Sequence, residues 1–292
     1  MPPPFGYGTA IILHFGIFST HFATQYYAWA LKAKRRKQAK KTPVSVAYCT
    51  DSYLHNFFRY PTDCTLVFTQ EAFEKNKNKS QYRGGKLVKV PFFIRQQAFE
   101  IDTDKQELRT SLGFPKDKFT VVLAEGGYGI GKMQKICEIL LKKDLPVTVV
   151  PVCGKNEKLF EYFKTLKPEF DSVTFIPMGF NKRMIETVAA ADLFVGKAGA
   201  SSIAEPTFFG VPSIVSGCAS VVETNLTKHY CKTVGSTMKI TNAKKIVEAI
   251  EKFVKNPDLL IPYAEKAKAD RSNYGAETTA DLLWNILKGD KL

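Results

Sequence analysis

Residues 120–132 read TVVLAEGGYGIGK. This stretch begins with a β-branched apolar run, which predicts a buried strand. A glycine-rich loop follows and opens an apolar pattern of helical period over 131–143. Strand, glycine loop and helix N-terminus together can receive an anion, because glycine lets the backbone approach the ligand and free N–H groups face it. Taken alone, the loop is equally compatible with a tight strand-to-helix turn.

The glycine spacing disfavours two familiar nucleotide sites. From Gly127 the pattern is G-x-G-x-G instead of G-x-G-x-x-G, and the acidic residue that would bind the ribose of NAD about twenty positions later is absent. Met133 follows Lys132 where a P-loop requires Ser or Thr. The sequence therefore argues against both a nicotinamide dehydrogenase and a P-loop nucleotidase.

A second turn rich in small residues, GKAGASSIAEP, covers residues 196–206. It follows the apolar run 193–195 and precedes a predicted helix over 202–209. The order of strand, turn and helix is thus the same as in the first loop. Two such turns in one region point to a shared ligand more strongly than either does alone.

Glu205 in this turn has two interpretations. Ser202 and Glu205 have the spacing of a capping box, in which the carboxylate bonds back to the start of the helix. Alternatively, the turn amides hold a diphosphate and the carboxylate accepts both hydroxyls of a ribose, since it offers two acceptor oxygens and no donor. Pro206 lacks an N–H group, which only the first helical turn can spare. Neither interpretation explains this proline.

Apolar runs and amphipathic runs alternate along the whole chain. Strands are expected at 10–19, 44–49, 65–69, 87–90, 120–124, 147–152, 173–177, 193–195 and 213–216. Helices are expected at 20–41, 104–112, 131–143, 155–166, 181–191, 202–209, 222–231, 243–254 and 276–287. The alternation predicts an α/β protein with parallel sheets. A polar segment near residue 100 predicts a boundary between two regions, 1–100 and 101–292.

The net charge of +14 predicts attraction to polyanions. The densest basic cluster spans residues 32–41 and could bind anionic lipid headgroups. It could equally be the solvated end of a helix, where cations suit the helix dipole. Specific nucleic-acid binding would rest on net charge alone, because no known motif is present.

The sequence gives little support for a membrane-spanning helix or for a metal site. Residues 9–31 are long enough to span a bilayer, but His14, His21 and Gln25 interrupt them, so a strand followed by a helix is preferred. The six cysteines form no C-x-x-C pair, and the four histidines have no matching spacing to them. We therefore expect buried free thiols in a reducing compartment and no metal site.

Several segments between residues 108 and 235 resemble, in order and spacing, the C-terminal half of the GT-B glycosyltransferases of family 28. This family includes the monogalactosyl- and glucosyl-diacylglycerol synthases and the bacterial lipid-linked N-acetylglucosamine transferase. The segments are AEGGYGIGK, VVPVCGKNEKL, FIPMGF, AAADLFVGKAGASSIAE and GVPSIVS. Residues 153–159 and 197–205 look like the glycolipid synthase branch. The resemblance implies a GT-B fold of two Rossmann-like halves.

The first hundred residues resemble the same branch more faintly. Residues 49–55, CTDSYLH, are similar to a T-D-x-x-L-H segment of the diacylglycerol glucosyltransferases. Residues 88–95, VKVPFFIR, are similar to a G-I-P-I-R segment before the domain linker, with Val90 where that family has glycine. His21 stands where the family carries a strand ending in a similar histidine.

The resemblance implies a donor site for a UDP-sugar. By this resemblance, the cleft would be lined by Gly126, Gly127, Gly129 and Gly131, and the uracil would be framed by Gly179 and Phe180. The diphosphate would be held by Gly199, Ala200 and Ser201, and the ribose would be bound by Glu205. Lys197 could help neutralise the diphosphate or could be a surface lysine. Glu223 and Asn225 stand near the positions that contact the sugar, but an apolar residue occupies the expected glutamine position. The sugar therefore stays open.

The implied reaction is inverting transfer of a hexose from a UDP-sugar to a membrane lipid such as diacylglycerol, with the UDP-sugar as co-substrate and no other cofactor. Asp51 and His55 are the available general bases. The competing interpretation makes Asp51 a cap at a strand end and His55 its satisfied partner. The expected location is cytoplasmic, peripheral on an anionic membrane.

The sequence MPPPFGYGTA at residues 1–10 resembles a point partway through the family's first half, so we expect an incomplete N-terminal half. The predicted helix at 276–287 would pack back on that half. A partner subunit could supply the remaining elements. The alternative functions are a UDP-sugar-binding subunit or non-catalytic relative and, less favoured, a UDP-sugar epimerase of the same superfold.

Overall fold

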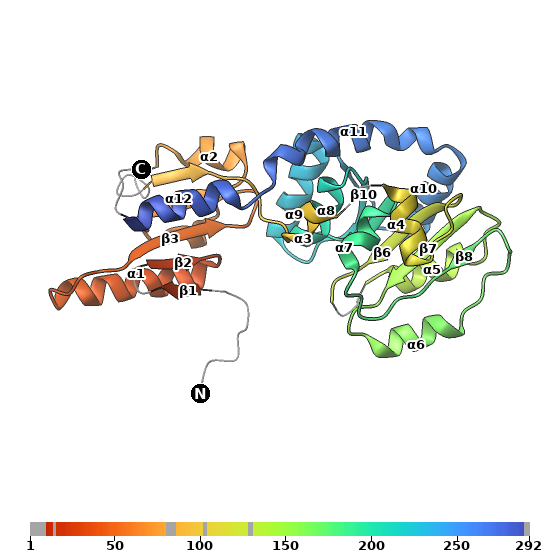
Figure 1. The fold of residues 1–292 in the computed structure, drawn as a ribbon, viewed down its shortest axis with the longest axis horizontal. Helices are drawn as coiled ribbons and strands as arrows, with labels where there is room; N and C mark the ends of the chain where they lie inside the picture. Colours follow the sequence, from red (N-terminus) through yellow and green to blue (C-terminus); the bar gives the residue numbers. More distant parts are fainter. Residues whose placement is uncertain (1–9, 14–15, 80–85, 102–103, 128–130, 289–292) are drawn as a thin grey trace. The chain divides into compact units, whose positions relative to one another are not determined.

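The computed structural model describes residues 10–13, 16–79, 86–101, 104–127 and 131–288. The chain divides into two compact units (Figure 1). The first unit contains residues 1–93 and 273–292, and the second contains residues 94–272. Each unit is built around its own sheet.

The sheet of the first unit has the strand order β1-β2-β3-β4-β5. The strands are β1 (Ala10–Leu13), β2 (Gly16–Ser19), β3 (Val44–Cys49), β4 (Cys64–Val67) and β5 (Lys86–Lys89). From β2 to β5 the neighbours are parallel. This parallel arrangement is what the alternating sequence pattern predicts.

The prediction of one strand over residues 10–19 is wrong. β1 is antiparallel to β2, with Ala10 opposite Ser19 and Leu13 opposite Gly16. The apolar run therefore folds back on itself. Only two residues separate the strands, which is the length of the commonest hairpin connection. An apolar run does not by itself reveal such a reversal.

The helices of the first unit are α1 (Phe22–Lys37), α2 (Gln70–Asn76) and α12 (Glu277–Lys288), with a short 3₁₀ turn at Asn56–Phe58. The His21 ring accepts the Ala23 N–H at the start of α1, and four cations occupy the last turn. α12 lies along the sheet (Figure 1), and an added Cβ on Gly16 would come within 2.8 Å of the Leu287 side chain.

The second unit has a fully parallel sheet with the order β11-β10-β9-β6-β7-β8. Its strands are β6 (Phe119–Ala124), β7 (Val147–Val152), β8 (Thr174–Phe175), β9 (Leu193–Lys197), β10 (Ser213–Gly217) and β11 (Thr237–Lys239). The chain builds outward from β6 to β8, then returns to the other side of β6 as β9. In open α/β sheets, ligands bind beyond the carboxyl ends of the strands at such a reversal.

Helices cover both faces of this sheet. They are α3 (Gln97–Glu100), α4 (Lys105–Leu112), α5 (Met133–Leu140), α6 (Glu157–Thr165), α7 (Met184–Ala189), α8 (Ala200–Phe208), α9 (Val221–Lys228), α10 (Ala243–Lys255) and α11 (Ile261–Ala269). A π-helical stretch, His229–Val234, continues α9, and 3₁₀ turns occupy Pro257–Leu260 and Asp270–Asn273. The predicted helices are present with shifted ends, whereas α2, α3, α11 and β11 were not predicted.

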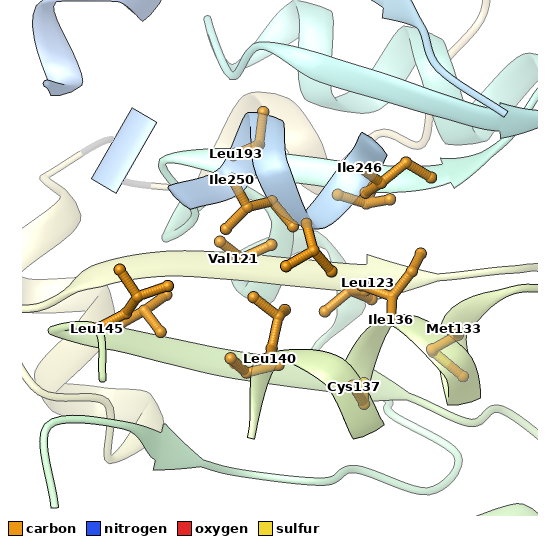
Figure 2. Packing of buried hydrophobic residues seen from close by; sticks show 14 of the residues in the cluster. Val121, Leu123, Met133, Ile136, Cys137, Leu140, Leu145, Leu193, Ile246 and Ile250 are labelled. Carbon is orange, nitrogen blue, oxygen red and sulfur yellow. The ribbon is translucent and has the colours of Figure 1, made fainter. Parts of the chain in front are cut away.

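The main core packs one face of the second sheet against α5 and α10 (Figure 2). Val121 and Leu123 of β6 lie between these helices and are fully buried. Val122, between them in sequence, is also fully buried, so β6 is covered on both faces. Burying each large aliphatic side chain contributes about 1.5–3 kcal/mol. The loops after β6 and β9 therefore start from a rigid base.

Candidate functional site

The buried carboxylate of Glu125 joins the end of β6 to the start of α5 and to β10. Its Oε2 atom accepts the Met133 N–H at 2.8 Å, and its Oε1 atom accepts the Ser216 hydroxyl at 2.6 Å. The first bond caps α5, where a negative charge also suits the helix dipole. The second bond joins the end of β6 to the end of β10. Lys132 adds another tie, because its Nζ atom donates to the Ser216 carbonyl at 2.7 Å.

The glycines of this loop serve different purposes. An added Cβ on Gly131 would overlap the Glu125 carboxylate, so this glycine is needed by the protein itself. Gly126 has a φ of +80°, which favours glycine. The Gly127 carbonyl accepts the Lys155 N–H at 2.6 Å, yet an added Cβ on Gly127 would meet nothing within 4 Å in the described part of the chain. Gly129 lies outside the described residues.

A cavity of about 280 Å³ lies within the second unit at the carboxyl ends of β6, β7 and β9. Its lining residues are Arg95, Ala124, Gly126, Gly127, Val152, Gly154, Phe180, Asn181, Met184, Val188, Phe194, Ser201, Ser202, Glu205 and Pro206. This is the place where the strand order reverses. Mostly apolar walls with a few convergent polar groups are typical of a small-molecule site.

The structure brings some of the expected donor residues together at this cavity. Gly126, Gly127, Phe180, Ser201 and Glu205 line it. Phe180 is 68% exposed although it is a large aromatic residue, and an exposed ring can stack on a planar ligand. The remaining expected donor residues that the structure describes are Gly131, Gly179, Lys197, Gly199, Ala200, Glu223 and Asn225, and none of these belongs to the lining.

Three of these residues flank the cavity where β9 passes into α8. Lys197 is the last residue of β9, Gly199 is the N-cap of α8, and Ala200 is its first residue. The N-cap makes no side-chain bond, so the first N–H groups of α8 lack a capping side chain. Unsatisfied N–H groups at a helix start can bind an anion such as a phosphate.

Glu205 is not a capping residue, so that interpretation is wrong. α8 begins at Ala200, two residues before Ser202, and Glu205 therefore lies well inside the helix. Its Oε1 atom accepts from Arg95 Nε at 2.9 Å and its Oε2 atom from Arg95 Nη2 at 2.8 Å. The Glu205 side chain is 7% exposed and that of Arg95 is 47% exposed. A nearly buried carboxylate thus faces the cavity paired with one arginine.

Arg95 was not predicted as a site residue. The only signal for it in the sequence is the faint similarity of residues 88–95 to a family segment that ends in arginine. The two charges are far apart in the sequence, so no local spacing rule could have joined them. Their pairing is visible only in three dimensions.

A capping box does occur in this unit, at Ser220 and Glu223. The Ser220 hydroxyl accepts the Glu223 N–H at 3.1 Å, and the Glu223 carboxylate accepts the Ala219 N–H. This carboxylate therefore already has a role at the start of α9. A contact between Glu223 or Asn225 and the sugar stays a prediction.

Pro206 lies inside α8, beyond the first turn in which a proline is tolerated. Because it has no N–H group, the Ser202 carbonyl cannot receive its usual helical bond. Ser202 and Pro206 both line the cavity. The proline thus leaves a backbone acceptor without its helical donor beside the ligand space.

Asp51 and His55 form a pair in the first unit. Asp51 follows the end of β3, and its Oδ2 atom lies 2.9 Å from His55 Nε2. The His55 ring contacts the rings of Phe22, Tyr53 and Phe58. A carboxylate that orients a histidine suits a general base, and it equally suits a satisfied structural pair. Both interpretations of these residues stay open.

The structure also bears on metals, thiols and membrane spans. Among the described residues, no group of three or more His, Cys, Asp or Glu side chains could hold a metal ion. In the same part of the chain, no helix is long and apolar enough to cross a bilayer. Cys49, Cys64, Cys137 and Cys153 are buried free thiols, whereas Cys218 and Cys231 are partly exposed. Burial raises the pKa of Cys64 to about 12 and that of Cys153 to about 11.

Comparison with known sequences gives a consistent result. Residues 132–279 match the family model described as the glycosyltransferase family 28 C-terminal domain. An N-acetylglucosamine transferase from Thermoanaerobacter sp. strain X514, which acts on a pyrophosphoryl-undecaprenol lipid by name, is 28% identical over 76% of this chain and 68% of its own length. A processive diacylglycerol β-glucosyltransferase from Bacillus pumilus is 25% identical over 66% of this chain and 49% of its own length. Monogalactosyldiacylglycerol synthase 1 from Arabidopsis thaliana is 29% identical over 69% of this chain and 38% of its own length.

Solved structures establish the fold. MurG from Acinetobacter baumannii superposes with a TM-score of 0.59 at 14% identity, over 85% of this chain and 73% of that protein. Anabaena HepE, solved with UDP and glucose, has a TM-score of 0.57 at 14% identity, over 93% of this chain and 77% of that protein. The fold is of the GT-B type, as the sequence motifs led us to expect.

Proposed function

This chain belongs to glycosyltransferase family 28, and from that premise we propose that it transfers a hexose from a UDP-sugar to the hydroxyl group of a membrane lipid. Diacylglycerol is the acceptor we favour. The observation that carries the proposal is the cavity at the strand reversal of the second unit, where Glu205 and Ser201 of α8 line one space together with Gly126 and Gly127.

The donor would occupy this cavity in three parts. The free N–H groups at the start of α8 and the backbone of Gly126 and Gly127 would receive the diphosphate. Glu205 would accept the two ribose hydroxyls. Phe180 would stack on the uracil. Each part has the chemistry of the group that it would meet, which supports a nucleoside diphosphate over a single phosphate or a free sugar.

The reaction would invert the configuration at C1 of the sugar. A base takes the proton of the acceptor hydroxyl, the freed oxygen forms a bond to C1, and the bond from C1 to the diphosphate breaks to release UDP. Asp51 and His55 are the proposed base pair. The N–H groups at the start of α8 would stabilise the charge that develops on the departing UDP.

The lipid acceptor is supported by the relatives, whose names include lipid-linked and diacylglycerol acceptors. It is also supported by the surface of α1. Three large aromatic residues, which are usually buried, are exposed there: Tyr26, Tyr27 and Trp29. The basic cluster at 32–41 follows them, and every charged side chain among the first 50 residues is a cation. Aromatic rings beside cations suit the interface of an anionic membrane, so we propose peripheral attachment there from the cytoplasmic side.

Transfer to lipid tests the proposal. The full chain would be incubated with radiolabelled UDP-glucose, UDP-galactose or UDP-N-acetylglucosamine and with vesicles containing diacylglycerol. We expect a labelled glycolipid from one donor, and a loss of that product of about a hundredfold with Asp51→Asn, the usual contribution of a general base. UDP binding without transfer from any donor would instead support the alternative function, a sugar-nucleotide-binding subunit. Absence of both transfer and UDP binding would contradict the family assignment of the site.

A further inference from the structure

The ion pair between Arg95 and Glu205 creates a conflict inside the proposed donor cavity. The pair is bidentate, so each carboxylate oxygen of Glu205 already accepts from the guanidinium. A ribose would use the same two oxygens. The ribose therefore reaches Glu205 in full only when Arg95 withdraws.

Withdrawal of Arg95 is unfavourable without compensation. The Glu205 side chain is nearly buried, and removing one partner of a buried charge pair leaves the other charge uncompensated. Ribose hydroxyls are neutral, so they replace the hydrogen bonds of the guanidinium but not its charge. The affinity for a nucleoside without phosphates is therefore lowered by the free energy of separating Arg95 from Glu205.

A nucleoside diphosphate brings the missing charge. Among the described residues that line the cavity, Arg95 carries the only positive charge and Glu205 the only negative one. Gly126, Gly127 and Ser201 line the same space, so a diphosphate beside them lies within one cavity with Arg95. The Arg95 side chain is about half exposed, so it can change rotamer without displacing the core, whereas Glu205 is nearly buried within α8.

We propose that Arg95 is a specificity-determining residue that exchanges partners when the donor binds. In the empty cavity it neutralises Glu205. When a nucleoside diphosphate enters, the guanidinium moves to the diphosphate and the ribose hydroxyls replace it on Glu205. The exchange couples recognition of the ribose to recognition of the diphosphate, and it disfavours nucleosides that lack phosphates. This inference rests on the proposed function, since it assumes that the cavity takes UDP.

Other nearby cations are poorly placed to do the same. Lys132 is held by the Ser216 carbonyl at 2.7 Å. Lys197 lies at the end of β9 and is not part of the cavity lining. Because an arginine fork matches both carboxylate and diphosphate oxygens, the exchange keeps bidentate bonding at each end.

The test is calorimetric titration of the full chain with uridine and with UDP, for the wild type and for Arg95→Gln. Glutamine keeps a donor but removes the charge. We expect uridine affinity to rise about threefold, because the competitor is gone, and UDP affinity to fall about tenfold, because one charge-assisted contact to the diphosphate is lost. The preference for UDP over uridine should therefore shrink about thirtyfold.

Arg183→Gln is the matched control, because Arg183 is an arginine of the same unit that pairs with Glu186 and does not line the cavity. It should leave both affinities unchanged. If Arg95→Gln fails to fold, Arg95→Lys replaces it and should shift both affinities in the same directions by smaller factors. Thermal unfolding followed by circular dichroism identifies the folded variants.

Equal losses of uridine and UDP affinity in Arg95→Gln would overturn the proposed exchange, because Arg95 would then only hold the Glu205 side chain in its binding conformation. Equal gains would overturn it as well, since Arg95 would then only block the site. Unchanged affinities for both ligands would also overturn the exchange. If the wild type binds neither ligand, the proposed function itself fails, and the exchange fails with it.

Discussion

Two glycines that look alike in the sequence differ in purpose at the scale of single residues. Gly131 makes room for the Glu125 carboxylate, whereas Gly127 lines the cavity, and an added Cβ there would meet no atom of the described residues within 4 Å. The first glycine is thus needed by the fold. The second is free for the approach of a ligand.

This difference predicts opposite results for two alanine substitutions. Gly131→Ala should lower the free energy of unfolding by about 1–3 kcal/mol, because the new methyl group overlaps Glu125. Gly127→Ala should change it by less than about 0.5 kcal/mol, as for an uncrowded site, and should weaken UDP binding. Denaturant unfolding and UDP titration of both variants measure the two effects. An unchanged UDP affinity in Gly127→Ala would show that the donor does not approach this backbone.

The role of Glu205 could not be predicted from sequence spacing alone. The spacing of Ser202 and Glu205 fits a capping box as well as it fits a ligand site. In the structure, however, the capping box is formed by Ser220 and Glu223. Spacing reveals a cap only when the first helical residue is known. The role of Glu205 depends on that residue and on Arg95, which is distant in the chain. The ribose interpretation of Glu205 stays a prediction.

At the scale of elements, Lys32 anchors α1 to the sheet of the first unit. Its Nζ atom donates to the Ser45 hydroxyl at 3.2 Å and pairs with the Asp63 carboxylate. Burial by itself raises the pKa of Asp63, but the bonds from Lys32 and from the Ser45 N–H outweigh it, so the pKa lies below its usual value. The ionised carboxylate is therefore favoured by folding.

The direction of this shift predicts a pH dependence. The stabilising effect of Asp63 is present above the unfolded-state pKa of about 4 and is lost as pH falls through the lower folded-state pKa. Asp63→Asn should lower the free energy of unfolding at pH 7 by about 2 kcal/mol, less than for a fully buried pair because Asp63 is half exposed. Urea unfolding from pH 7 to pH 3 should show the difference from wild type shrinking.

Glu71→Gln provides the control for this measurement. Glu71 pairs with Lys75 on the exposed surface of α2, so its loss should change stability by less than about 0.5 kcal/mol. A difference between Asp63→Asn and wild type that stays constant down to pH 3 would contradict the assigned role of Asp63.

The elements themselves were largely readable from the sequence. The parallel strands β6 and β7 are long runs rich in β-branched residues, and their burial on both faces explains why each is a nearly continuous apolar stretch in the sequence. β11 is too short to show such a run. α11 follows a 3₁₀ turn that begins at Pro257, holds Pro262 in its own first turn and buries only Ala267, so it gives almost no amphipathic pattern.

At the scale of the whole molecule, the positive charge predicts selective binding to anionic vesicles. Sedimentation with vesicles containing phosphatidylglycerol should recover more protein than sedimentation with neutral phosphatidylcholine vesicles, and added salt should abolish most of this difference. Replacing Lys34, Arg35, Arg36 and Lys37 by glutamine should remove most of this binding, since each cation near the surface contributes about 1 kcal/mol.

The same number of cations can be removed elsewhere as a control. Replacing Lys244, Lys245, Lys252 and Lys255 of α10 by glutamine changes the net charge equally but leaves α1 intact. This variant should keep most of its vesicle binding. Equal losses in the two variants would show that net charge, rather than α1, directs the protein to the membrane.

The central claim is that the cavity of the second unit binds the UDP part of the donor through Glu205. Calorimetric titration of UDP into the wild type, Glu205→Ala and Glu223→Ala tests it most directly. We expect the wild type and Glu223→Ala to bind UDP with similar affinity. Glu205→Ala should bind it about 10–100-fold more weakly, since hydrogen bonds to a charged group contribute about 1.5–3 kcal/mol. UDP affinity that is unchanged in a folded Glu205→Ala protein, or the absence of UDP binding in the wild type, would contradict the claim.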